Sequence, residues 1–148
     1  HLGVRRQRQM CIRDRLNRMA ARLDISDRVT IESSMGFNEI SEMYRASDLV
    51  VYPSYYEGQG LIPLEAMSSG TPVITVDHGP LPEMVDSSVG ALFELGSVDS
   101  LSETISSELS SNETLLQKGA EGRKRVLERF TLDKNAERFI EVYARACR

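Results

Sequence analysis

The stretch that decides the fold runs from residue 57 to residue 67 and reads EGQGLIPLEAM. Its two glycines predict a loop, and the apolar run after them predicts a helix that tolerates Pro63 in its first turn. The β-branched runs before it, Leu49 to Tyr52, and after it, Val73 to Val76, predict buried strands. A loop between such a strand and a helix lies at the carboxyl edge of a parallel sheet, where helix N-termini bind anions.

The rest of the chain continues this alternation of short apolar strands and helical segments. We therefore predict an α/β fold, a Rossmann-like parallel sheet flanked by helices and followed by C-terminal helices. Strands are expected at 29–31, 49–52, 73–76 and 90–93. Helices are expected at 39–46 with Asn38 as N-cap, at 82–85 as one turn, at 98–109, at 115–129, and at 135–146 after a cap at Thr131 or Asp133.

The first 15 residues do not fit this pattern. They carry five arginines and one aspartate, and the run RQRQMCIRDR has no helical or strand periodicity and resembles translated sequencing-adapter sequence. We predict that residues 1–15 are a non-native or disordered segment, with a genuine basic tail as the alternative. Residues 16–148 then begin inside a helix, so the first strand-helix unit of the domain is expected to be incomplete.

The charge distribution excludes one class of function. Without residues 1–15 the chain holds 13 basic and 21 acidic residues, a net charge of −8, which argues against a nucleic-acid partner. No Lys or Arg occurs between Arg45 and Lys118, whereas eleven Asp and Glu do. If the central loop binds a diphosphate, its balancing cations must therefore come from elsewhere.

Composition also bears on localisation. No apolar run approaches the roughly 18 residues that a membrane span needs. Cys11 and Cys147 have no metal-ligand or redox spacing, so a reducing compartment is the default. We expect a cytoplasmic protein, peripheral to the membrane if its acceptor is lipid-linked.

Several motifs, in order, resemble the retaining glycosyltransferases of family 4, which have the two-domain GT-B fold. They are ASDLVVYPS at 46–54, EGQGL at 57–61, LEAM at 64–67 and GTPVI at 70–74. Glu57 and Glu65, separated by seven residues, match the E(x7)E motif of that family. Residues 79–83 are similar to its Gly-Gly-Leu-Pro-Glu loop, and 129–131 to the entry of its last helices. The resemblance covers residues 16–145.

The resemblance implies that residues 16–148 are a partial C-terminal, donor-binding domain of an enzyme that transfers a sugar from a nucleoside diphosphate sugar to an acceptor hydroxyl with retention. Glu57 would contact hydroxyls of the donor sugar, which makes it the candidate catalytic residue, and Glu65 would bind the ribose. An ionised carboxylate accepts paired hydroxyl donors well. The other expected donor-binding residues are Ser54, Gly58, Gly60, Leu61 and Ile62.

Simpler roles stand beside these. The two glycines can serve turn geometry alone, Ser54 can cap or pack, and His78, which replaces a glycine of the family loop, is more often an ordinary loop histidine. The lysine and arginines at 123–125 are expected to form a solvated helix face. The segment ESSMG at 32–36, where the family binds the base, departs from its pattern.

The implied ligands are a nucleotide-sugar donor and a glycan, lipid-linked or small-molecule acceptor bound through an N-terminal domain. We expect no further cofactor and no metal, because the chain has no Asp-x-Asp motif. The family's phosphate-binding arginine and lysine belong upstream of residue 16, so the fragment alone is expected to be inactive. The alternatives are a non-catalytic nucleotide-binding or interaction module of GT-B type and a receiver-like domain, although Asp48 precedes its strand instead of following it.

Overall fold

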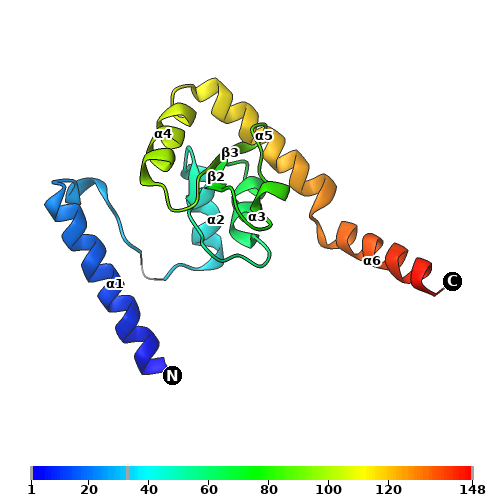
Figure 1. Ribbon diagram of the computed structural model, residues 1–148, viewed down its shortest axis with the longest axis horizontal. Coiled ribbons are helices and arrows are strands. Elements are labelled where there is room, and N and C mark those ends of the chain that lie inside the picture. The colour runs from blue at the N-terminus through cyan, green and yellow to red at the C-terminus, as the bar shows by residue number, and fades with distance from the viewer. Residues whose placement is uncertain (1, 33, 148) are drawn as a thin grey trace. The chain divides into compact units, whose positions relative to one another are not determined.

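A computed structural model describes residues 2–32 and 34–147 (Figure 1). The chain divides into two compact units, residues 1–36 and residues 37–148.

The first unit is mainly one helix, α1 (Leu2–Arg22), followed by the short 3₁₀ helix η1 (Ser26–Arg28). Residues 1–15 have no helical periodicity, so this helix was not predicted. From residue 2 onward the segment is nevertheless part of one unbroken helix. Whether the segment is native stays a prediction. The strand expected at 29–31 is wrong: Val29 has an extended backbone, but 29–31 pairs with no strand among the described residues. A strand needs a hydrogen-bonded neighbour, and β-branched residues alone do not provide one.

The second unit is built on a parallel three-stranded sheet in the order β1-β2-β3, with β1 (Val50–Tyr52), β2 (Val73–Val76) and β3 (Gly90–Phe93). The register aligns Val50 with Val73 and Val73 with Gly90, so the three strands end at one edge. The α/β fold class is thereby confirmed, with three paired strands among the described residues instead of the four expected.

The helices of the second unit lie where periodicity predicts them, with shifted ends. They are α2 (Phe37–Ala46), α3 (Leu61–Ser68), the 3₁₀ helix η2 (Leu81–Glu83), α4 (Val98–Glu108), α5 (Asn112–Arg129) and α6 (Leu132–Ala146). Thr131 caps α6 by accepting a hydrogen bond from the Lys134 N–H, as one of the two expected caps would. Asn38 is not a cap, because α2 already begins at Phe37.

The core lies between the sheet and helices α3 and α5. All four residues of β2 are buried, and they pack with Met67, Leu81, Val85 and Val89. The strand predicted at 49–52 was expected to be buried on both faces. This prediction is wrong, because the residues of β1 are only half-buried. β1 pairs with β2 alone and is the sheet's edge among the described strands, so its outer side has less cover.

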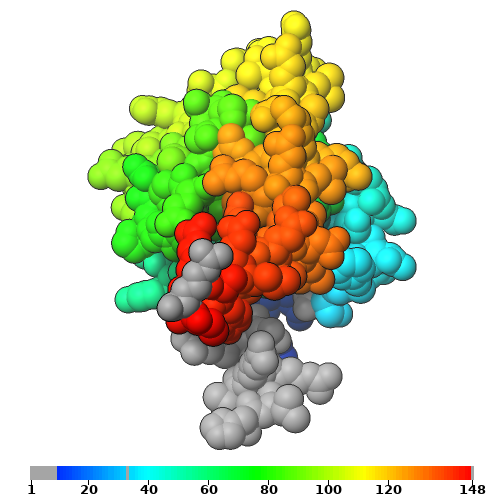
Figure 2. Space-filling model, turned by 90° about the vertical axis from the view of Figure 1, so that its right-hand side faces the viewer, coloured from blue at the N-terminus to red at the C-terminus, as the bar shows by residue number. Residues whose placement is uncertain are grey.

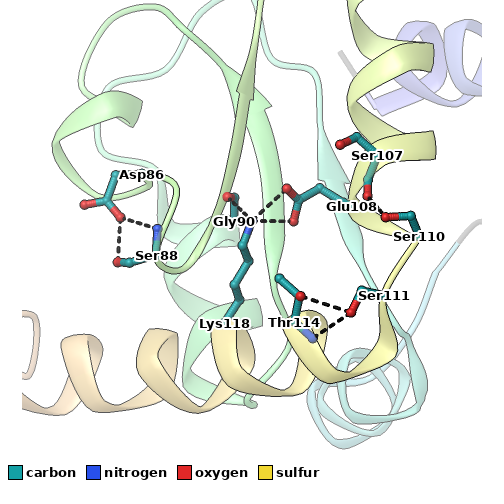
Figure 3. A network of polar contacts seen from close by, with 9 residues as sticks. All are labelled: Asp86, Ser88, Gly90, Ser107, Glu108, Ser110, Ser111, Thr114 and Lys118. Carbon is teal, nitrogen blue, oxygen red and sulfur yellow. Dashed lines mark hydrogen bonds and ion pairs between the residues drawn. The ribbon is translucent and has the colours of Figure 1, made fainter.

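Helix α5 packs against α3 and β3, and its Lys118 contacts α4. Figure 2 shows α5 in yellow and orange across the face of this unit, with α6 in red below it. Its Gly119 packs closely against the turn that follows α3. An added Cβ at Gly119 would lie 2.1 Å from the carbonyl oxygen of Gly70 in that turn. Lys118 donates to both carboxylate oxygens of Glu108 at 2.7 Å and to the carbonyl of Gly90 at 3.1 Å (Figure 3).

The basic cluster at 123–125 on α5 is only partly the solvated face that was expected. Arg123 donates to the carbonyl of Ser68 at the end of α3, and Arg125 is 13% exposed and donates to the carbonyl of Met84. Lys124 is 60% exposed. The helix spacing places the two arginines toward α3 and η2, and the sequence carried no sign of those acceptors.

Candidate functional site

The site is built on the loop between β1 and α3. Gly60 is the N-cap residue of α3 and has φ +70°, a conformation that favours glycine. It is also packed, since a Cβ there would lie 2.3 Å from the Met84 Cε atom. The first N–H groups of a helix have no acceptor within it, and Pro63 has no N–H to offer. The backbone donors of the first turn are therefore those of Leu61 and Ile62, as expected for an anion site.

Gly58 differs from Gly60 in backbone conformation and in packing. It does not have a positive φ, and an added Cβ would meet nothing within 4 Å. Neither turn geometry nor packing within this chain therefore requires glycine at this position. Gly58 is exposed, and the close approach of a ligand to its backbone stays a prediction.

Glu57 lies in the same loop with its carboxylate held at two points. The Tyr52 hydroxyl, at the end of β1, donates to its Oε2, and the Gln59 N–H donates to its Oε1 at 3.0 Å. The hydrogen bond from Tyr52, aided by backbone N–H groups of the loop, lowers the pKa of Glu57 to about 2. Glu57 is therefore a fixed anion at neutral pH, suited to accept hydrogen bonds from sugar hydroxyls.

Glu65 is exposed on the second turn of α3. Its Oε2 accepts a hydrogen bond from the Tyr44 hydroxyl of α2 at 3.2 Å. Burial, together with the Glu65 charge and this hydrogen bond, raises the pKa of Tyr44. The helical spacing of Ile40, Met43 and Tyr44 predicts that all three face inward. Tyr44 is half-buried, as predicted, whereas Met43 is 46% exposed. A contact between Tyr44 and Glu65, 21 residues apart, gave no signal in the sequence.

A cavity of about 80 Å³ lies beside Glu57, between the β1–α3 loop and the loop after β2. It is lined by Ser54, Tyr55, Tyr56, Glu57, His78, Gly79 and Leu81. The structure thus brings Ser54 and Glu57 together with His78, for which sequence reasoning favoured an ordinary loop role. Ser54 also donates to the Tyr56 carbonyl at 2.9 Å, so it shapes the loop as well. Small-molecule sites usually measure about 300–1,000 Å³, so this cavity by itself is smaller than a complete ligand site.

Glu65 and the first turn of α3 do not line this cavity. Of the segment 32–36, expected near the base, residue 33 lies outside the described residues, and the segment belongs to the first unit. In the part of the chain that the structure describes, no group of three or more His, Cys, Asp or Glu could hold a metal ion. Metal-independent chemistry stays a prediction.

The part of the sequence that contains this loop, helix and pair of glutamates matches a known protein family. The family model described as "Glycosyl transferases group 1" matches residues 12–125, which is most of the chain. The chain belongs to this family. The match includes both glutamates, the glycine loop and the three strands that position them.

Named relatives of this glycosyl transferase group 1 chain agree in class. It is 35% identical over 135 residues to a D-inositol 3-phosphate glycosyltransferase from Streptomyces bingchenggensis, an alignment that covers 91% of this chain and 30% of that protein. The chain therefore spans about a third of that relative's length.

Solved structures agree in fold. The C-terminal domain of the group 1 glycosyl transferase LpcC from Francisella tularensis superposes with a TM-score of 0.75 at 28% identity, covering 84% of this chain and 65% of that one. Anabaena HepE, solved in complex with UDP-glucose, superposes with a TM-score of 0.78 at 22% identity, covering 88% of this chain and 36% of that one. The second likeness concerns the fold alone. The fold of this chain is thus similar to the C-terminal domain of a GT-B glycosyltransferase.

No helix within the described ranges is both long and apolar enough to cross a membrane. The long helix α1 is rich in arginine, and α5 has charged residues throughout.

Proposed function

We propose that this chain is the donor-binding part of a retaining glycosyltransferase of family 4, which transfers a sugar from a nucleoside diphosphate sugar to an acceptor hydroxyl. The observation that carries the proposal is the placement of two glutamates around one helix N-terminus. Glu57 borders the cavity, Glu65 lies on α3, and the Leu61 and Ile62 N–H groups lie between them along the chain.

Each part of the donor can be matched to one of these groups by its chemistry. Phosphate oxygens suit the backbone donors and the positive end of the helix dipole, where a carboxylate would repel them. The sugar and ribose hydroxyls suit carboxylates. We assign the diphosphate to the first turn of α3 with close approach at Gly58, the sugar to the cavity beside Glu57 and Ser54, and the ribose to Glu65. Gly60, which is buried against Met84, would contribute by shaping the turn.

This part of the enzyme leaves the diphosphate charge only partly balanced. No Lys or Arg side chain lies between positions 45 and 118. In the proposed transfer, charge develops at the anomeric carbon and on the leaving phosphate, and aligned donors stabilise it. The missing cations and the acceptor site would belong to sequence beyond the third of the family length that this chain spans. The chain alone is therefore proposed to bind the donor weakly and to transfer no sugar.

Calorimetric titration tests the proposal. The purified chain is titrated with UDP, GDP, ADP and the corresponding glucose nucleotides, since the base is open. One series is expected to bind with a Kd of millimolar order, about −4 kcal/mol, and Glu65→Ala is expected to abolish measurable binding. Glu103→Ala, which removes an exposed glutamate of α4, is the matched control. If Glu65→Ala binds as the parent does, the ribose assignment is wrong.

Retention and catalysis need the longer protein. The anomeric configuration of the product, read by proton NMR during the first turnovers, is expected to match that of the donor sugar. A longer protein that binds the donor and transfers nothing to any acceptor would favour the non-catalytic alternative.

A further inference from the structure

We propose that Tyr44 and Tyr52 are positioning residues that hold the two donor-binding glutamates, one tyrosine for each carboxylate. The inference rests on the proposed function, because it explains how the donor groups are presented. Its structural basis is a repeated relationship: each glutamate accepts a hydrogen bond from a phenol on a neighbouring element, and each phenol belongs to a residue whose backbone is tied to the sheet or to the turn beside it.

Tyr52 is the last residue of β1, paired in register with Thr75 of β2. The buried Thr75 hydroxyl donates to the Tyr52 carbonyl at 3.2 Å, which anchors the end of the strand. The Tyr52 hydroxyl then donates to one oxygen of Glu57, and the Gln59 N–H holds the other. The N–H groups of Gly58 and Gly60 also act on this carboxylate. Glu57 itself lines the cavity, so its carboxylate is held by its own loop at the cavity wall.

Tyr44 serves Glu65 in the same way from α2. Its carbonyl accepts a hydrogen bond of 2.6 Å from the Thr71 hydroxyl, and Thr71 is only 3% exposed. Its own hydroxyl reaches Glu65 on the adjacent helix α3 at 3.2 Å. Without this contact Glu65 would be an exposed helix side chain with several accessible rotamers, and a ligand would have to immobilise it.

The consequence is affinity gained by preorganisation. Ordering one free, rotamer-rich side chain on binding weakens an interaction by about three- to tenfold. Tyr52→Phe removes the restraint on Glu57 and keeps the aromatic ring, and Tyr44→Phe does the same for Glu65. In our assignment the sugar contacts Glu57 and the ribose contacts Glu65. The two variants should therefore differ in which ligand they bind more weakly.

The test uses UDP and UDP-glucose as probes by calorimetry, with the nucleotide pair exchanged if another base binds. Tyr52→Phe is expected to weaken UDP-glucose about three- to tenfold and to leave UDP unchanged, whereas Tyr44→Phe weakens both equally. Tyr143→Phe, on the exposed face of α6, is the control and should change neither. If both variants bind like this control, the positioning roles are overturned while the proposed function stands.

A second readout needs no ligand. Carbon-13 NMR of the side-chain carboxyls should show the pKa of Glu57 rising from about 2 toward about 4.3 in Tyr52→Phe, and not in Tyr44→Phe. For the other pair, Glu65→Gln should lower the pKa of Tyr44, because the charge that helps to raise it is gone. Unchanged titrations overturn the proposal even if no nucleotide binds, and failure to bind with changed titrations overturns the proposed function instead.

Discussion

Arg125 and Asp86 form a two-point ion pair between α5 and the segment that leads into β3. Nη1 of Arg125 lies 3.0 Å from Oδ2 of Asp86, and Nη2 lies 3.1 Å from Oδ1. The same guanidinium donates to the Met84 carbonyl at 3.1 Å and to the Ser88 hydroxyl at 2.7 Å. One side chain thus holds the loop that packs under Gly60 through Met84.

We expect Arg125→Met to destabilise the fold by about 1–3 kcal/mol, because the Met84 carbonyl loses its partner in a largely buried place. Urea unfolding followed by circular dichroism measures this. Lys124→Met is the matched control: Lys124 is 60% exposed with its ion-pair partner 3.7 Å away, so its loss should cost about 0–1 kcal/mol. Equal losses in the two variants would contradict the structural role of Arg125.

The same pair predicts acid sensitivity. Burial acts to raise the pKa of Asp86, but hydrogen bonds from Arg125 and Ser88 outweigh it and lower the pKa to about 2. In the unfolded chain an aspartate has a pKa of about 3.9. A lowered folded-state pKa stabilises the fold above the unfolded pKa, and this contribution is lost as pH falls from about 4 to about 2.

The stability difference between the parent and Asp86→Asn should therefore be constant from pH 7 to about pH 5 and shrink below about pH 4. Urea titrations at a series of pH values give this difference directly. A difference that does not change with pH would mean that the charge of Asp86 does not contribute.

Gly119→Ala should destabilise the fold although alanine favours helices. The added Cβ would lie 2.1 Å from the Gly70 carbonyl oxygen, a backbone atom that cannot turn aside. Overpacking of this kind costs about 1–3 kcal/mol. Gly58→Ala places the same methyl group where nothing lies within 4 Å, so it should change stability by no more than about 0.5 kcal/mol. Thermal unfolding of the two variants should separate them clearly.

Thr71→Val should loosen α2 from the turn before β2. The Thr71 hydroxyl is buried and donates to the Tyr44 carbonyl at 2.6 Å, so its loss should cost about 1 kcal/mol. Thr104→Val removes a comparable bond to the Ser100 carbonyl at 2.7 Å, but both residues lie in α4, so no tie between two elements is lost. We expect little change there. Hydrogen exchange of the α2 amides should rise in Thr71→Val alone, and equal exchange in both variants would argue against the tie.

The sequence was sufficient to predict the parallel α/β fold, its three strands to within one residue and all helices from 37 onward. These elements have local causes: β-branched runs, helical spacing of apolar residues, and a threonine cap at position 131. Predictions failed where pairing or packing decides. Residues 29–31 have the composition of a strand but pair with none of the described strands. β1 has the composition of an inner strand but lies at the edge of the sheet that the structure describes.

The same division holds for the site. Motif order predicted a site that contains Glu57, Glu65 and the glycine loop, because these groups lie within 11 adjacent residues that form a loop and the start of a helix. Only the tertiary structure decided what holds these groups. Tyr44 and Tyr52 contact the glutamates, and His78 lines the cavity of Glu57. Packing against Met84 requires glycine at position 60, whereas no described residue lies close enough to require it at position 58. Such contacts depend on side-chain positions across elements that lie apart in the chain, and no local pattern records them.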